Sequence, residues 1–250
     1  MPVRRTPRPA IHGSATSGVG VVDRAAAILR AVEGGNHRFS TIANTTGLPR
    51  ATAHRLIRAL EDQGFLAHYG EYGYRLGPGL LRLANRAARE LPLRDVAHPV
   101  LEHLADVTGE SAQLFVRSGD ERVCVDAVES ANELRTIVPV GASLPLFAGS
   151  AAKVFLAHAP DPERHLRKAR DLERFRRDVE LVASRGWASS TDERQSGVGS
   201  VSAPIVGEHD VLLGVVSVSG PASRMGRTNA RRYGQAVMEA ARRIERSLGL

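Results

Sequence analysis

The sequence predicts an α+β fold in which helices pack against a sheet. Two observations carry this prediction. The first third contains three amphipathic helical patterns followed by two short alternating segments. The remainder interleaves strands and helices without the regular rhythm of a parallel sheet. With 250 residues, the chain is long enough for two modest domains, or for one large one.

The first helix is expected directly after an unstructured arm. Residues 1–18 are rich in Pro, Arg, Gly and Ser and lack periodicity, which predicts a disordered arm. Asp23 is the expected N-cap of the helix that follows, in which apolar residues recur at helical spacing up to Val32. Two glycines, Gly34 and Gly35, end it.

The second and third helices have the spacing of a helix-turn-helix. Ser40 is the expected N-cap of a short helix that breaks at Gly47, and Pro49 stands in the first turn of the next. Ala43 is small enough to let the two helices approach, and Gly47 supplies the tight turn. This arrangement is typical of proteins that read the major groove of DNA.

The exposed face of the third helix is the candidate DNA reader. Once its apolar residues are buried, the outward positions carry groups that can bond base edges and phosphates. These positions are Arg50, Thr52, His54, Arg55 and Arg58. Ser40 and Thr41, at the start of the second helix, can hold a phosphate, because helix N-termini favour anions.

A glycine-turned hairpin after the third helix is expected to form a wing. The segment FLAHYGEYGYRLG alternates weakly and holds Gly70 and Gly73 near its centre. Tyr74 and Arg75, together with Tyr72, are expected to rest on the adjacent DNA backbone. Residues 1–77 contain ten arginines against five acidic residues, so most of the chain's net charge of +7 lies here. A basic first domain favours nucleic acid as a partner, the alternative being a three-helix bundle with solvated arginines.

The rest of the chain begins with a linker helix and continues as a mixed region. Residues 78–91 form an amphipathic helix that we interpret as the linker. Helical patterns follow at 93–109, 148–159, 161–185 and 231–250, and strand patterns at 112–117, 122–128, 135–141, 200–206 and 211–220. The apolar stripes on the linker and the final helix are faces that another copy of the chain could cover.

The strand at 211–220 points to a small-molecule pocket. Ser217 and Ser219 are two residues apart, so both side chains face one side of the sheet. Hydroxyls on a face that should be core must bond either the neighbouring backbone or a ligand. The small residues of the segments AGSAA and GVGS leave room beside them for a compact metabolite.

Patterns for catalysis, cofactors and metals are weak. The run SGVGS lacks the spacing of a nucleophile elbow and the ending of a P-loop. Cys124 lies in an apolar strand pattern, and His158 and His165 lack a zinc-binding pattern. We therefore expect no catalytic residue, no cofactor and no metal. One cysteine, no signal segment and no apolar run that could span a membrane favour a cytoplasmic protein.

Six segments together resemble the IclR family of bacterial transcriptional regulators, over about residues 19–248. They are SGVGVVDRAAAILRAV, GLPRATAHRLIRALEDQGFL, YRLGPGLLRLA, GASLPLFAGSAAKVFLA, RGWASSTDERQSGVGSVSAPI and GVVSVSGP. Each is a weak match alone, but their order and separations are specific. The branch that looks most similar controls amino-acid biosynthesis, leucine in particular.

The resemblance implies the following organisation: a winged helix-turn-helix domain at 19–77, the linker helix at 78–91, and a GAF-like effector-binding domain at 92–250. It implies a ligand-responsive regulator that binds an operator in double-stranded DNA and acts as a homodimer or a dimer of dimers. The implied effector-binding residues are Thr136, Ser150, Ala151, Ser190, Val198, Ser200, Ser217 and Ser219. The alternatives are a metabolic enzyme with a DNA-binding appendage and an architectural DNA binder without a ligand.

Overall fold

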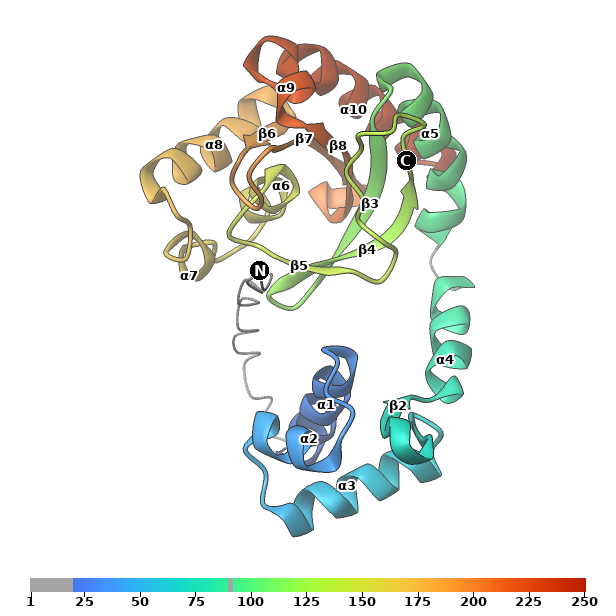
Figure 1. Ribbon diagram of the computed structural model, residues 1–250. Coiled ribbons are helices and arrows are strands. Elements are labelled where there is room, and N and C mark those ends of the chain that lie inside the picture. Colours follow the sequence, from blue (N-terminus) through green and yellow to red (C-terminus); the bar gives the residue numbers. More distant parts are fainter. Residues whose placement is uncertain (1–19, 90–91) are drawn as a thin grey trace, which may run out of the picture. The chain divides into compact units, whose positions relative to one another are not determined.

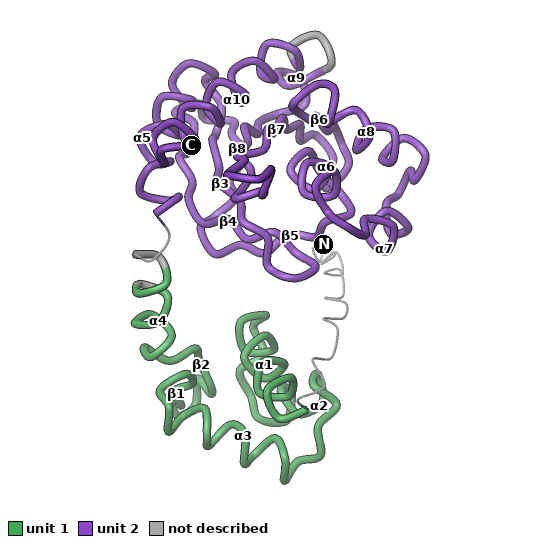
Figure 2. Tube along the Cα trace, turned by 180° about the vertical axis from the view of Figure 1, so that it is seen from behind, with its two compact units in different colours: residues 1–87 green, residues 88–250 purple. Residues whose placement is uncertain are grey.

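The computed structural model describes residues 20–89 and 92–250 and divides the chain into two compact units, 1–87 and 88–250 (Figure 2). The arm predicted at residues 1–18 lies outside the described residues. Each unit has its own apolar core. Because each core is self-contained, the units are described separately.

Three helices build unit 1: α1 (Gly20–Glu33), α2 (Phe39–Thr46) and α3 (Arg50–Asp62). Their buried side chains, together with Leu66 from the segment after α3, form one core: Ile28, Ala31, Val32, Ile42, Ile57, Leu60 and Leu66. The left-handed backbone of Gly47 (φ 66°) ends α2 as predicted, because glycine adopts this conformation without steric cost.

Both predicted N-caps are wrong. α1 begins at Gly20, so Asp23 lies inside its first turn, where a carboxylate interacts favourably with the helix dipole. α2 begins at Phe39, so Arg38 takes the cap position that Ser40 was expected to fill. Phe39 packs against the core of unit 1, and this packing draws the helix start two residues earlier than the polar sequence indicates.

A two-stranded hairpin completes unit 1 before the helix α4 (Pro78–Arg89). β1 (Leu66–His68) pairs antiparallel with β2 (Tyr74–Leu76) across a single 3-10 turn, η1 (Gly70–Tyr72). The backbone N–H of Tyr74 donates to the carbonyl of His37 at 2.7 Å. A Cβ at Gly73 would lie 2.2 Å from that carbonyl oxygen, so the hairpin can dock against the segment before α2 only with glycine there.

Unit 2 is built on an antiparallel sheet of six strands in the order β5-β4-β3-β8-β7-β6, curled as Figure 1 shows. The strands are β3 (Ser111–Ser118), β4 (Glu121–Val128), β5 (Ser143–Pro145), β6 (Ala188–Thr191), β7 (Val198–Val206) and β8 (Leu212–Pro221). The strand predicted at 135–141 is wrong, because this segment is irregular: Ile137 and Val140 are exposed and Pro139 has no N–H. β6, with the short polar sequence ASST, was not predicted.

Helices cover both faces of this sheet. On one face lie α5 (Pro92–Thr108), α9 (Ala222–Met225) and α10 (Arg227–Leu248); on the other lie α6 (Ser150–Ala157), α7 (Glu163–Leu166) and α8 (Leu172–Arg185). A short 3-10 turn, η2 (Glu208–Asp210), joins β7 to β8. α6 lies in the hollow of the curled sheet (Figure 1).

The linker helix α4 and the final helix α10 were both expected to carry an apolar stripe that another copy of the chain could cover. The two stripes have different surroundings in the structure. On α10, Tyr233, Val237 and Ile244 are buried against the sheet and α5 of their own unit, so this stripe is not a free face. On α4, Leu83 is 49% exposed and Leu80, one turn away on the same side, is half-buried, whereas Leu81 is 68% exposed on a different side of the helix. Of the two helices, α4 is therefore the one that leaves leucines exposed in the described chain.

Candidate functional sites: a basic helix face and a serine-lined cavity

Helix α3 turns one apolar face inward and a basic face outward. Ala53, Ile57 and Leu60 are buried at helical spacing. The predicted outward residues follow from this packing: Arg50, His54, Arg55 and Arg58 are exposed and Thr52 is half-buried. No hydrogen bond or ion pair joins Arg55 or Arg58 to another residue within the described ranges. Their guanidinium groups are therefore available to an external partner.

Phe39, which the sequence analysis did not single out, organises two of these side chains. The guanidinium carbon of Arg50 lies 5.6 Å from the centre of the Phe39 ring, a cation–π distance. The ring of His54 meets the same ring edge-on, with centroids 6.1 Å apart. The sequence did contain a signal for Phe39, because an aromatic residue stands directly before the predicted start of α2. Its contacts with Arg50 and His54 could not be predicted, because they depend on the angle between α2 and α3.

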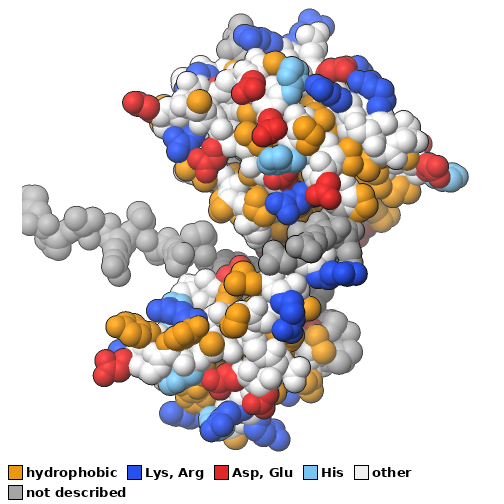
Figure 3. Space-filling model, turned by 90° about the vertical axis from the view of Figure 1, so that its right-hand side faces the viewer, with side chains coloured by type: hydrophobic (Ala, Val, Ile, Leu, Met, Phe, Trp, Pro, Cys, Tyr) orange, Lys and Arg blue, Asp and Glu red, His pale blue; other side chains and the backbone are white. Residues whose placement is uncertain are grey.

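The start of α2 adds further polar groups to this surface. Ser40 and Thr41 are exposed in its first turn, and Arg38 is exposed directly before it. The side chain of Arg38 caps no helix amide, so the N–H groups of that first turn are available to an anion. Basic and histidine side chains gather at the lower end of unit 1 in Figure 3, where Figure 1 draws α3.

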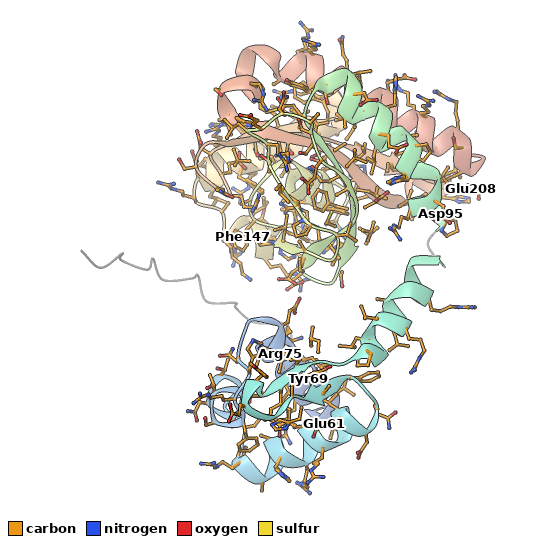
Figure 4. The ribbon with its side chains drawn as sticks, turned by 45° about the vertical axis from the view of Figure 1, so that its right-hand side comes forward. Glu61, Tyr69, Arg75, Asp95, Phe147 and Glu208 are labelled. Carbon is orange, nitrogen blue, oxygen red and sulfur yellow. The ribbon has the colours of Figure 1, made fainter. Side chains whose placement is uncertain are left out.

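Among the tyrosines of the hairpin, Tyr74, which was predicted to contact DNA, is less exposed than Tyr72 and Tyr69. Tyr74 is half-buried against the core of unit 1, and its ring lies 4.7 Å from that of His68. Burial, aided by the nearby Glu61, raises the pKa of Tyr74. Tyr72 and Tyr69 are 75% and 55% exposed, and Figure 4 labels Tyr69 and Arg75 on the hairpin, with Glu61 on α3. Arg75 is half-buried.

In unit 2, seven of the eight residues expected to bind an effector line one cavity. Ser150 and Ala151 come from α6, Ser190 from β6, Val198 and Ser200 from β7, and Ser217 and Ser219 from β8. The cavity holds about 420 Å³ of space free of atoms, including the part open to solvent. Thr136 is buried but is not among the residues that line this cavity.

Five serine hydroxyls form a continuous row beside the cavity. The Oγ atom of Ser200 lies 3.0 Å from that of Ser190 and 2.7 Å from that of Ser150. Ser202 continues the row, with its Oγ 2.7 Å from Ser150 and 2.8 Å from Ser217. The Ser217 hydroxyl donates to the carbonyl of Val201 at 3.3 Å. Ser202 was not predicted, because its register opposite Ser217 is set by the pairing of β7 with β8.

A buried lysine fixes the loop after β6 next to this row. Lys153 of α6 is fully buried, and its Nζ donates to Asp178 at 2.7 Å, to Glu193 at 2.5 Å and to the carbonyl of Ser189 at 2.8 Å. The second oxygen of Glu193 accepts from the backbone N–H of Gly149 at 3.1 Å. A buried charge is tolerated because it is paired in this way, and the pairing ties the loop to the start of α6.

Two arginines that the sequence analysis missed also line the cavity, Arg122 of β4 and Arg194 of the loop after β6. Arg122 is buried, its guanidinium carbon lies 5.6 Å from the centre of the Phe115 ring, and it donates to the carbonyls of Pro145 and Ala148. The available signal was the alternation of β4: Arg122, Cys124 and Asp126 face the buried side and the valines between them do not.

The described residues offer few features suited to catalysis, metal binding or membrane insertion. Cys124 is buried, and burial raises the pKa of its thiol to about 12, which leaves it protonated and unreactive near neutral pH. Across residues 20–89 and 92–250, no three His, Cys, Asp or Glu side chains are grouped to hold a metal ion. Within the same ranges, no helix has the length and apolar character needed to cross a membrane.

Two sequence families match this chain, one for each unit. The family described as IclR helix-turn-helix domain matches residues 21–68, and the family described as bacterial transcriptional regulator IclR C-terminal matches residues 85–246. The second match alone covers more than half of the chain.

Three proteins are also similar to this chain over nearly their full length. The transcriptional repressor IclR of Escherichia coli is 27% identical, covering 100% of this chain and 97% of its own length. The HTH-type transcriptional regulator TtgV of Pseudomonas putida is 32% identical, covering 93% of each chain. The glycerol operon regulatory protein of Streptomyces coelicolor is 31% identical, covering 91% of this chain and 96% of its own.

Solved structures agree with these sequence matches. A transcriptional regulator from Alicyclobacillus acidocaldarius is 25% identical with a TM-score of 0.78, covering 92% of this chain and 98% of its own. An IclR homologue from Microbacterium hydrocarbonoxydans, crystallised as a complex with 4-hydroxybenzoate, is 25% identical with a TM-score of 0.76, covering 92% and 99%.

Proposed function

This chain belongs to the IclR family of ligand-responsive bacterial transcriptional regulators, and from that premise we propose how its own residues divide the work. Unit 1 reads an operator in double-stranded DNA through the exposed face of α3. Unit 2 binds a small metabolite in the serine-lined cavity. In this division, residues 19–77 form the winged helix-turn-helix domain, 78–91 the linker and 92–250 the GAF-like effector domain.

The observation that carries the DNA-reading role is the row of basic side chains on α3. Arg55 and Arg58 are exposed with no bond to other described residues, while Phe39 holds Arg50 and His54 beside them. An arginine can donate twice to O6 and N7 of guanine, and Thr52 can contact a thymine methyl group. Ser40, Thr41, Tyr74 and Arg75 then position the unit on the phosphates.

The direct test is the change Arg55→Ala in the full chain. Operator fragments are first selected from the host genome by binding to the wild-type protein, and affinities are then measured by fluorescence anisotropy at several salt concentrations. We expect Arg55→Ala to weaken operator binding by about 1–3 kcal/mol and to relax specificity at one base pair, because one bidentate contact is lost.

The matched control is Arg177→Ala, which removes the same charge from the exposed surface of α8. Operator affinity of this variant should equal that of the wild type. An Arg55→Ala protein with wild-type affinity and wild-type salt dependence would remove Arg55 from the interface.

The effector role of the cavity rests on its small-residue walls and its polar lining. Ser150, Ser190, Ser200, Ser217 and Ser219 supply the polar groups, with Ala151, Val198 and Thr136 as neighbours. The genes controlled are those of amino-acid or related carbon metabolism. Repeating the operator selection with and without extracted host metabolites tests this role, since an unresponsive operator affinity contradicts it.

We further propose that the protein acts in the cytoplasm as a homodimer or dimer of dimers, and that it is not an enzyme. The exposed leucines of α4 support self-association. Cys124 is buried and protonated, and the serines of the cavity bond one another, so neither offers an activated nucleophile. Turnover of any candidate metabolite by the full chain would favour the alternative, a metabolic enzyme with a DNA-binding appendage.

A further inference from the structure

Two side chains of the exposed face of α3 share one aromatic partner. Arg50 and His54 stand four residues apart on α3, so both lie on the same side of the helix. The guanidinium of Arg50 lies over the Phe39 ring, and the ring of His54 meets the same ring edge-on. Neither side chain has a hydrogen bond or an ion pair with another described residue. Contact with Phe39 is therefore what can fix the positions of their polar ends.

Phe39 is itself held in place. It is the first residue of α2, is half-buried and packs against the core of unit 1. Its aromatic side chain has few rotamers, whereas the long side chain of Arg50 has many. The negative face of the ring attracts the guanidinium, so Arg50 is biased toward one arrangement before DNA arrives.

The other exposed arginines of α3 have no such support. Among the described residues, Arg55 and Arg58 neither bond another side chain nor lie over an aromatic ring. Ordering them on DNA costs rotamer freedom, and Arg50 has already lost part of that freedom. Arg50 opens α3 and His54 lies in its first half, which is the part of a reading helix that contacts base edges. The side chains arranged in advance are therefore placed where donor geometry decides between bases.

From the shared ring, its anchorage in the core and the place of the pair in α3, we infer that Phe39 is a specificity-determining residue for operator recognition. It acts as a positioning residue through Arg50 and His54, holding both in the arrangement that meets the base edges. Phe39 carries no charge, so it sets the sequence preference and leaves the salt-dependent attraction to phosphates unchanged. This inference rests on the proposed DNA-reading role of α3 and names the residue that sharpens it.

The test compares Phe39→Leu with Phe39→Tyr in the full chain. Leucine keeps an apolar side chain against the core but lacks the ring, and tyrosine keeps the ring. Fluorescence anisotropy at several salt concentrations gives the affinity for a selected operator fragment and for a random-sequence fragment. We expect Phe39→Leu to lower the ratio of the two affinities by about 3- to 10-fold, because ring contacts of this kind contribute a factor of a few each. Binding of the random fragment and the salt dependence should match the wild type, and Phe39→Tyr should keep the ratio.

A double-mutant cycle separates action through Arg50 and His54 from any other effect of Phe39. The pair Arg50→Ala and His54→Ala removes both partners, and adding Phe39→Leu to this pair should not lower the ratio further. Ile42→Val is the matched packing control, because Ile42 is fully buried in the same helix. It should lower the stability of unit 1 in urea denaturation and leave the affinity ratio unchanged.

Four outcomes overturn the inference. They are a wild-type ratio in Phe39→Leu, an equal loss in Phe39→Tyr, an equal loss in Ile42→Val, and a further loss when Phe39→Leu is added in the absence of Arg50 and His54.

Arg55→Ala, measured on the same fragments, separates this inference from the proposed function. If Arg55→Ala weakens operator binding while Phe39→Leu keeps the ratio, α3 reads DNA without the help of Phe39. If no change on α3 affects operator binding, the proposed reading face is wrong, and the role of Phe39 is wrong with it.

Discussion

Arg122, which lines the cavity, and Lys153 of α6 are two buried cations with different surroundings. Lys153 is bonded by two carboxylates and a carbonyl, so its charge is compensated within the protein. Arg122 meets two carbonyls and a ring, but no carboxylate bonds it. Lys153 is therefore compensated by bonded carboxylates, whereas Arg122 is held by carbonyls and a ring alone among the described residues.

Also at the scale of single residues, the buried His165 predicts that the stability of unit 2 depends on pH. His165 is buried, and this burial lowers its pKa below 6.5, with only part of the effect offset by Asp120. The Nε2 of its ring accepts from Nε of Arg164 at 3.2 Å, which requires the neutral ring. Below about pH 6.5 the unfolded chain takes up this proton before the folded chain does, so stability decreases as the pH falls.

We therefore expect the free energy of unfolding of unit 2 to fall less between pH 7 and pH 5 in His165→Gln than in the wild type, as measured by urea denaturation at both pH values. His103→Gln, which removes an exposed histidine from α5, is the control. Equal losses in His165→Gln and the wild type would show that His165 does not contribute.

At the scale of elements, the hairpin is placed by one close backbone approach. The N–H of Tyr74 and the ring nitrogen Nδ1 of His37 both take part in bonds between the hairpin and the segment before α2, at 2.7 and 3.0 Å. Gly73 allows this approach and has a positive φ of 71°. The hairpin's position beside α3 therefore depends on glycine at this position.

Gly73→Ala should detach the hairpin. We expect it to destabilise unit 1 by more than Gly70→Ala, which incurs only the cost of a left-handed backbone, about 1 kcal/mol, because nothing lies within 4 Å of a Cβ there. Hydrogen exchange at the amide of Tyr74, which bonds His37, should accelerate in Gly73→Ala alone. Equal exchange in the two variants would contradict this account of the docking.

At the scale of the whole molecule, exposed leucines on α4 are a feature that another chain would explain. Leu81 and Leu83 are exposed, although each unit buries a core of its own. The stripe of α10, by contrast, is covered within unit 2. Exposed apolar side chains on a helix are commonly covered by another chain, which supports the proposed self-association.

Accordingly, we expect the double change Leu81→Gln and Leu83→Gln to lower the molar mass of the protein in sedimentation equilibrium. Its far-ultraviolet circular dichroism should match the wild type, because neither side chain is buried in the described chain. Leu213→Gln, on an exposed position of β8, is the control. An unchanged molar mass would show that α4 does not join the chains.

The sequence by itself determined the features that depend on local spacing. Gly47 ends α2, the buried Ala53 and Ile57 turn the arginines of α3 outward, and the two-residue spacing of Ser217 and Ser219 puts both hydroxyls on the cavity side. Periodicity reports which side of an element is buried, and these features need nothing more.

Only the tertiary structure decided what each buried side faces. It put Tyr74 partly into the core, covered the stripe of α10, and gathered serines from α6, β6, β7 and β8 into one row. It also brought Arg122 of β4 and Arg194 of a distant loop to the same cavity. The physical reason is that these contacts join residues far apart in the chain, through strand register and helix packing, which local spacing does not encode.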